Sequence, residues 1–367
     1  MKTNNSLNTS EVRAEQVTNA QYEAVYLGVD LHKESISVTR IIDQSTPQPA
    51  QRFIWETFWR FIEKQKSLAK KVYVVYEAGA FGFWVCRRLK SMGLECFVAH
   101  PEKLDPRHKR VQTDRLDSRH LADKLQRYVW GNHKAMVAVY VPTEQEEQHR
   151  MQARHRRKLH QQMQSLMARG RGLLLSQGIF QTQLWWRDGL WADLQPKLSG
   201  HLAAVLQDLR ALIEQCQKLL RPVEQKLEDS APKQLPRGFG RLTFALLLCE
   251  VGNYQRFENR RNIGGFTGLC GGVSSSGPYH LDLSINKAGN PYLRTLLIEL
   301  AWRVVYWQPN YQGRRIWNRL CPRGAVVHKR RRKAAIVALA RQLAVDIWKW
   351  QTGKATPEQL GWEMRKA

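Results

Sequence analysis

The sequence predicts an α/β domain, a pair of long helices and a mainly α-helical C-terminal domain, in that order along the chain. Up to residue 143, apolar runs rich in β-branched residues alternate with helical patterns, which is typical of a sheet covered by helices. Two long polar helical stretches follow within residues 144–231, and apolar helical patterns return from residue 232. The chain of 367 residues also exceeds the roughly 250–300 residues at which single cores stop growing.

Five strand patterns and three helix patterns account for the α/β domain. Strands are expected at residues 25–29, 35–42, 52–54, 71–76 and 95–99, and helices at 56–68, 83–92 and 114–130. The polar segment 1–22 lacks the apolar centre of a signal peptide and is expected to be a disordered arm. The predicted divisions of the chain are the arm (1–22), the α/β domain (23–143), a coiled-coil region (144–231) and the C-terminal domain (232–367).

The middle region is expected to be an antiparallel coiled coil that mediates dimers. Its helical stretches cover residues 144–175 and 202–227, and paired polar helices of this length usually form such a structure. Trp185, Trp186 and Trp191 lie in the connection between the stretches. Exposed tryptophans can stack on nucleobases, but packing at the tip of the coiled coil is the more common role.

The C-terminal domain has clear helix signals and one segment without them. Asn290 followed by Pro291 is a good helix start, so a helix is expected from there to Trp307. A final helix is expected over residues 325–350. The segment 271–277 is rich in Gly and Ser, and it is therefore expected to be a loop.

The composition indicates a polyanionic partner. Lys and Arg number 58 against 32 Asp and Glu, which gives a formal net charge of +26 and a pI near 10.1. A positive potential of this size attracts nucleic acid first and an anionic membrane surface second. No apolar run reaches the roughly 18 residues of a membrane span. The six cysteines form no C-x-x-C pair, which indicates free thiols in a reducing cytoplasm.

Acidic residues stand at three places where a metal site would need them. Asp30 ends the first predicted strand, Glu77 ends a later one, and Asp114 and Asp117 share one face of a predicted helix. Four carboxylates in one cleft repel one another unless cations neutralise them, and hard oxygen ligands suit Mg²⁺ or Mn²⁺. Two such ions about 4 Å apart can clamp the attacking and leaving oxygens of a phosphoryl transfer.

Each of these acids alone has an ordinary structural explanation. An Asp at a strand end is usually a turn or cap residue, and an Asp pair in a first helical turn is favoured by the helix dipole. Their combined order in a strongly basic chain indicates a metal-dependent nuclease with an RNase H-like α/β fold.

Several short stretches, spread over most of the chain, resemble one known family. They are Gly28–Lys33, Tyr76–Gly82, Thr113–Ser118, Phe266–Leu269, Ser274–Gly277, Asn286–Asn290 and Leu293–Arg294. In order and spacing they are similar to the DEDD transposases of the insertion-sequence 110 family. Members of that family are bridge-RNA-guided serine recombinases with a RuvC-like domain and a C-terminal transposase (Tnp) domain.

The resemblance implies a function and a set of site residues. Asp30, Glu77, Asp114 and Asp117 would be the metal-binding carboxylates, and Ser276 would be the nucleophile, with Ser275 as its nearest competitor. The serine would form a covalent phosphoserine link to DNA, in a composite site built by two subunits. The implied partners are donor and target DNA, a guide (bridge) RNA from the element itself and further copies of the chain, as a homodimer or tetramer. The implied location is the bacterial cytoplasm, in association with the nucleoid, without membrane contact.

Basic residues near these stretches are predicted to contact phosphate backbone. Such contacts position a nucleic acid without reading its sequence. The predicted contacts are Arg110, Arg115, Arg154, Arg157, Lys287, Arg294, Lys329, Arg330 and Arg331.

Two other functions remain open from the sequence. The first is a metal-dependent RuvC-like nuclease or Holliday-junction resolvase that uses the carboxylates and water without a serine nucleophile. The second is a non-catalytic nucleic-acid-binding protein descended from such an enzyme. The retained carboxylates argue against the second.

Overall fold

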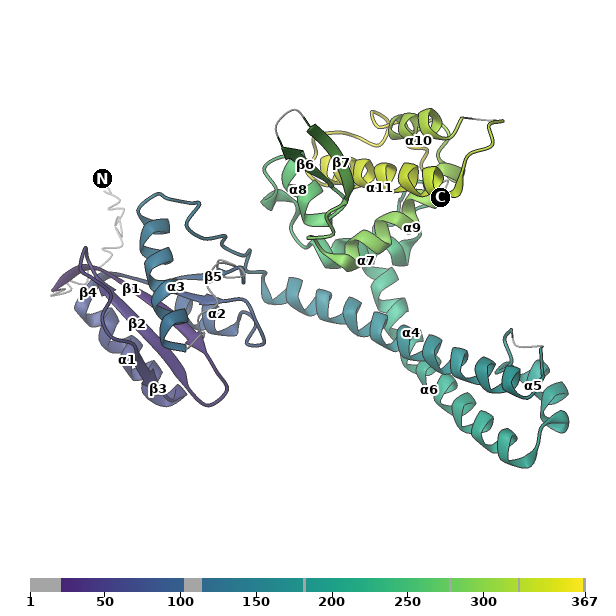
Figure 1. Ribbon diagram of the computed structural model, residues 1–367, viewed down its shortest axis with the longest axis horizontal. Helices are drawn as coiled ribbons and strands as arrows, with labels where there is room; N and C mark the ends of the chain where they lie inside the picture. Colours follow the sequence, from purple (N-terminus) through teal and green to yellow (C-terminus); the bar gives the residue numbers. More distant parts are fainter. Residues whose placement is uncertain (1–20, 102–113, 181–182, 277–278, 323, 366–367) are drawn as a thin grey trace, which may run out of the picture. The chain divides into compact units, whose positions relative to one another are not determined.

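A computed structural model of the chain describes residues 21–101, 114–180, 183–276, 279–322 and 324–365. The side chains of Asp114, Arg115, Ser276 and Asp282 are outside this description, as are residues 1–20 of the predicted arm. The chain forms two compact units (Figure 1), one up to Pro142 and the other from Thr143.

A five-stranded mixed sheet is the centre of the first unit. Its order is β3-β2-β1-β4-β5. β2 pairs antiparallel with both β1 and β3, whereas β4 pairs parallel with both β1 and β5. The strands are β1 (Tyr22–Leu31), β2 (Ile36–Ile42), β3 (Gln51–Phe53), β4 (Ala69–Glu77) and β5 (Glu95–Ala99). All five predicted strands are therefore confirmed, and the first unit has the predicted α/β class.

The two faces of the sheet are covered by different helices. On one face, Val25, Leu27 and Val29 of β1 belong to the core that α1 (Trp55–Leu68) and α2 (Trp84–Ser91) complete. On the other face, Tyr26 packs in a smaller core with α3 (Asp114–Val129). Because strand side chains alternate between faces, Gly28 and Asp30 lie on the α3 face with Tyr26.

The second unit begins with a long helical hairpin (Figure 1). Its helices are α4 (Glu144–Ser176) and α6 (Gly200–Ser230), with the short α5 (Asp188–Leu194) and η1 (Gln195–Lys197) near the tip. Thr143 and Glu146 form a capping box that starts α4. Trp185 and Trp191 are buried, and Trp185 occupies the space left free by Gly170. The predicted helix pair is present, and these two tryptophans serve as core residues.

Helices make most of the rest of the second unit. Leu297, Leu343 and Phe244 contribute to one core, which joins α7, α9 and α11. These elements are α7 (Arg241–Val251), η2 (Tyr254–Arg256), α8 (Arg260–Thr267), α9 (Pro291–Trp307), η3 (Gln312–Arg314), α10 (Arg315–Leu320) and α11 (Lys329–Gln351). The predicted cap at Asn290 is confirmed, because its side chain accepts from two backbone N–H groups of α9.

The prediction of a loop at residues 271–277 was wrong. Residues 271–276, expected as a loop, form strand β6 (Gly271–Ser276), which pairs with β7 (Tyr279–Ile285). Gly and Ser have low strand propensity. The alternating apolar residues of β7 nevertheless supply a partner strand, which satisfies the backbone groups of β6.

The cysteine pairing matches the sequence-based expectation. All six cysteines are free thiols. Among the helices that the structure describes, none has the length and apolarity needed to cross a membrane.

Candidate active site

Two of the predicted acids lie next to each other at one edge of the sheet. Val29 pairs with Tyr76 on the neighbouring parallel strand, so Asp30 and Glu77 are the next residues on β1 and β4. Parallel strands lie about 4.8 Å apart. Both acids follow the alternation that places Val75 on the α3 face, so their side chains leave the sheet on the same side.

The direction of α3 brings its first turn to the same edge. Just after its end, Trp130 donates to the hydroxyl of Tyr26 (2.9 Å), in the first half of β1. Near its beginning, the Ser118 hydroxyl lies 3.0 Å from that of Thr39, which is paired with Gly28. α3 therefore runs antiparallel to β1, and its first turn, residues 114–117, lies at the carboxyl end of β1.

Gly28 allows α3 to approach the sheet closely. A Cβ atom at Gly28 would lie 2.1 Å from the carbonyl oxygen of Ser118 and 2.3 Å from the nitrogen of Ala122. Both are backbone atoms of α3, so no side chain fits between the helix and β1. This contact is two residues before Asp30, and it fixes the helix that carries Asp114 and Asp117.

The three acids whose side chains are described differ in environment. Asp30 is 23% exposed, and its Oδ2 lies 3.0 Å from Nε2 of His32. Glu77 is exposed at the last position of β4. Asp117 is half-buried, and its Oδ1 is buried without a hydrogen-bond donor in the described part of the chain. A buried carboxylate oxygen without a donor is costly, and a bound cation is one way to satisfy it.

The described side chains alone do not complete a metal site. Among them, no group of three or more Asp, Glu, His or Cys residues lies close enough to hold a metal ion. The side chain of Asp114, the fourth predicted ligand, is outside that set. The structure thus brings the backbone positions of all four acids to one end of the sheet.

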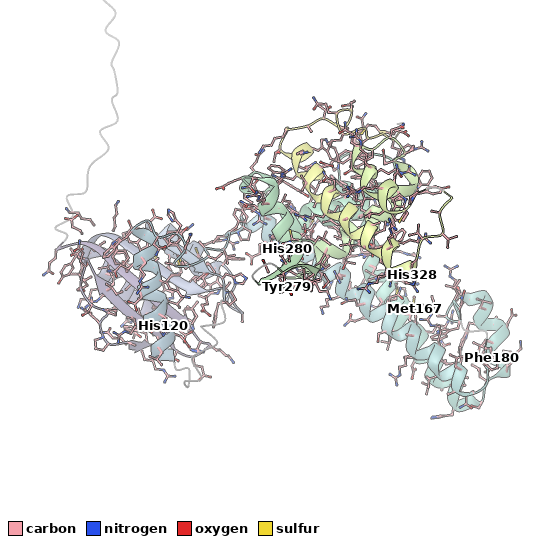
Figure 2. All side chains as sticks on the ribbon, turned by 45° about the horizontal axis from the view of Figure 1, so that its top comes forward. His120, Met167, Phe180, Tyr279, His280 and His328 are labelled. Atoms are coloured by element: carbon pink, nitrogen blue, oxygen red, sulfur yellow. The ribbon has the colours of Figure 1, made fainter. Side chains whose placement is uncertain are left out.

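The predicted nucleophile lies at the end of the β6–β7 hairpin. Ser276 is the last residue of β6 and pairs with Tyr279, whereas Ser275 pairs with His280. Opposite residues of an antiparallel pair share a face, so the two serine positions belong to opposite faces of the hairpin. Tyr279 is 80% exposed and Leu281, on the same face, is 62% exposed. Figure 2 labels Tyr279 and His280 on this hairpin.

The base of the hairpin is held by stretches that the resemblance singled out. The backbone N–H of Asn286 donates to Cys270 (2.9 Å), and that of Lys287 donates to Gly268. A Cβ atom at Gly289 would lie 2.3 Å from the nitrogen of Gly268, so the two segments touch through their backbones. These contacts fix the ends of β6 and β7, and with them the direction of the strand that carries Ser276.

Three predicted nucleic-acid contacts have partners inside the protein. Arg154 forms an ion pair with the buried carboxylate of Glu250. Arg157 lies over the ring of Tyr292, 4.2 Å from its centre. Arg294 donates to backbone carbonyls that include that of Thr267 (3.2 Å). These contacts give the three arginines structural roles, and their contact with nucleic acid stays a prediction.

The other predicted contacts fall into two groups. Lys287 and the first turn of α11, with Lys329, Arg330 and Arg331, are exposed. Arg110 and the side chain of Arg115 lie outside the described residues.

Several residues around these sites had no predicted role. His32 contacts Asp30, and Ser118 bonds Thr39 beneath α3. Both residues stand in the stretches that resemble the family, and that position in the sequence is what could have indicated a role for them. Glu250 gave no signal, because its partners are far away in the sequence.

Glu250 joins three elements of the second unit. Its carboxylate accepts from Nε and Nη2 of Arg154 on α4 (3.1 and 3.2 Å) and from the amide of Asn290 before α9 (2.8 Å). The carboxylate therefore holds α4, α7 and the base of the β6–β7 hairpin together. Burial and the neighbouring Glu250 also raise the pKa of the Cys249 thiol to about 11.

Arg154→Ala is expected to destabilise the second unit by about 2–3 kcal/mol, because Glu250 keeps a buried charge and loses the two hydrogen bonds that Arg154 donates. Adding Glu250→Gln removes that charge, and the double variant is expected to regain part of the loss. Urea unfolding of the single and double variants measures both effects. Equal stability of Arg154→Ala and wild type would contradict the structural role of the ion pair.

Comparison with known proteins places the chain among transposases, which are DNA-processing enzymes. The family described as "Transposase IS116/IS110/IS902 family" matches residues 234–316, which include the β6–β7 hairpin. The chain is 32% identical over 325 residues to y4rJ of Sinorhizobium fredii, which is named as a transposase, covering 79% of this chain and 81% of that protein.

Two further relatives are transposases for insertion sequence elements. That of IS1533 from Leptospira borgpetersenii is 25% identical, over 76% of this chain and 85% of the relative. That of IS1111A from Coxiella burnetii is 25% identical, over 81% of this chain and 82% of the relative. The chain therefore belongs to the IS116/IS110/IS902 family of transposases.

Proposed function

We propose that this transposase cleaves and rejoins DNA strands through a covalent phosphoserine intermediate, with Ser276 as the nucleophile and four acids as a metal site. The observation that carries the proposal is the meeting of Asp30, Glu77 and the first turn of α3 at one edge of the sheet. The strand order β3-β2-β1-β4-β5, with β1, β4 and β5 parallel, supports the RuvC-like character of this unit.

Asp30, Glu77, Asp114 and Asp117 would hold Mg²⁺ or Mn²⁺. Their all-oxygen donor set fits these hard cations, and the Oδ1 of Asp117, buried without a donor among the described residues, is the kind of atom that a cation satisfies. A bound divalent cation supplies charge neutralisation and polarises phosphate oxygens. His32, 3.0 Å from Oδ2 of Asp30, would orient that carboxylate.

In the proposed step, Oγ of Ser276 forms a bond to the phosphorus of a DNA phosphodiester. The bond from phosphorus to the departing deoxyribose oxygen breaks, and that oxygen takes up a proton while the serine loses one. One phosphate ester replaces another, so no energy source is needed. Attack on the phosphoserine by the hydroxyl of a second strand reverses the step and rejoins DNA.

The proposed choice of DNA sequence uses a guide RNA, and the working assembly is a dimer or tetramer. A net charge of +26 suits a chain that binds DNA and RNA together. The sequence contains no zinc-finger spacing that would read bases directly.

Ser276→Ala is expected to abolish the covalent adduct between protein and DNA, a loss of roughly 10³-fold or more, because no other group replaces the attacking oxygen. The measurement is denaturing electrophoresis after incubation with labelled DNA of the element end and Mg²⁺. Ser275→Ala is the matched control and is expected to keep the adduct, since the two positions lie on opposite faces of the hairpin.

Two results would count against this proposal. Full strand cleavage by Ser276→Ala would favour the nuclease or resolvase that uses water. Loss of the adduct in Ser275→Ala, with Ser276→Ala unaffected, would move the nucleophile to the other face of the hairpin.

A further inference from the structure

A cavity of about 720 Å³ lies in the second unit against the base of the β6–β7 hairpin. Gly271 of β6 and Leu283, Ser284 and Ile285 of β7 form part of its lining. The remaining lining comes mainly from α8, α10 and α11, and Figure 1 shows the hairpin beside α8 and α11. The cavity is therefore built on the same strands that carry the serines.

Five basic side chains line this cavity. They are Arg260, Arg261, Arg319, Lys333 and Arg341. They come from three separate helices, and no Asp or Glu stands among the described residues of the lining. The charge of the cavity is therefore strongly positive.

None of these five side chains forms a hydrogen bond or an ion pair within the described part of the chain. Elsewhere in the same unit, Arg154, Arg156 and Arg210 each have a carboxylate partner. Gathered like charges repel one another unless an anion neutralises them. Among the described residues, the basic side chains of the cavity thus have no carboxylate partner of the kind that other arginines of this unit have.

The surroundings favour an ionic ligand held by side chains. Leu269, Ile316 and Val337 contribute apolar walls, which lower the local dielectric and strengthen attraction to an anion. The first backbone N–H groups of α8 are already bonded to the side chain of Asn259. The basic side chains, and not the helix N-terminus, therefore make the site.

We propose that this cavity binds the phosphodiester backbone of the DNA strand on which the hairpin acts. The inference rests on the proposed function for its choice of DNA, because Ser276 is at the end of β6 and Gly271 at its start. Five residue steps along a strand span about 16 Å. The cavity therefore holds phosphates a few nucleotides from the one at Ser276.

The test measures DNA binding by the full chain with Ser276→Ala in every variant, so that no chemistry occurs. In the cavity variant, Arg261→Gln and Arg341→Gln remove two of the charges. In the charge-matched control, Arg169→Gln and Arg171→Gln change two exposed arginines of α4 that do not line the cavity. Fluorescence anisotropy with a labelled duplex of the element end gives Kd at several salt concentrations.

The cavity variant is expected to bind DNA at least roughly tenfold more weakly, and its salt slope is expected to fall by about 2, since each lost phosphate contact removes about 0.9. The control is expected to stay within about twofold of the parent. Because all four substituted arginines are exposed, both variants are expected to keep the parent's thermal unfolding midpoint.

An RNA duplex of the same sequence separates the two sources of phosphate. A loss confined to RNA would overturn the assignment to DNA, and equal binding by cavity variant and control would overturn the site itself. The adduct assay on the chain with Ser276 tests the proposed function separately. If that assay fails while the cavity variant still loses DNA affinity, the binding site stands and its link to cleavage does not.

Discussion

Asp117→Asn is expected to abolish DNA strand cleavage without weakening the fold. The first half follows from the loss of a charged ligand of the proposed metal site, which is expected to slow cleavage by roughly 10³-fold or more. The second half follows from the environment of Asp117, whose Oδ1 is buried without a donor in the described part of the chain. Removing a desolvated charge near Asp30 and Glu77 relieves a cost in the metal-free protein.

Thermal unfolding with and without Mg²⁺ makes this prediction specific. The wild-type midpoint is expected to rise with Mg²⁺, because a ligand that binds the folded state at 100 times its Kd adds about 2.7 kcal/mol. Asp117→Asn is expected to start at an equal or higher midpoint and to lose the rise. If Asp117 instead stabilised the fold, Asp117→Asn would have a lower midpoint than wild type without Mg²⁺.

Asp123→Asn is the matched control on the same helix, beyond the first turn. It is expected to keep both cleavage and the Mg²⁺-dependent rise. Should Asp117→Asn retain the rise, Asp117 does not hold the metal, and the proposed four-acid site is wrong.

The sheet and two of its acids were predictable because their signals are local. Each strand of the first unit is a short β-rich run, and Asp30 and Glu77 stand at the ends of two of them. A strand end is visible in the sequence because the apolar pattern stops there. The cap at Asn290 was predictable for the same reason, since Asn followed by Pro acts on the next few backbone groups.

The features that escaped prediction depend on partners far along the chain. Strand β6 has a loop-like composition and becomes a strand through its pairing with β7. Arg154 resembles any surface arginine until Glu250, 96 residues away, is seen to accept from it. The basic cavity combines side chains of α8, α10 and α11. These helices are separated in the sequence, so no single charge run shows that their basic residues gather.

The helix α11 starts later than its sequence predicts. The helix was expected from residue 325 but begins at Lys329, after His328 caps it through a hydrogen bond to the N–H of Arg330. A histidine is an uncommon cap, so this signal is weak in the sequence. The first turn of α11 is consequently almost entirely basic and exposed.

Gly28→Ala is expected to destabilise the first unit and to slow cleavage by roughly 10²-fold, although it removes no functional group. The added Cβ would lie 2.1 Å from Ser118 O and 2.3 Å from Ala122 N, which are backbone atoms of α3. Neither can move without moving the helix. Overpacking of this kind costs about 1–3 kcal/mol or more. A misplacement of about 1 Å at a catalytic group can reduce the rate by roughly 10²-fold.

Gly172→Ala on α4 is the matched control, since nothing lies within 4 Å of the added atom. Because Ala is favoured over Gly inside a helix by about 1 kcal/mol, this variant is expected to be slightly more stable and fully active. Urea unfolding and cleavage rates, both measured well below the unfolding midpoint, separate a shifted α3 from a loss of folded protein. A folded Gly28→Ala protein with the wild-type cleavage rate would show that the position of α3 does not set the geometry of the acids. The role of Asp114 and Asp117 in the site would then have no structural basis.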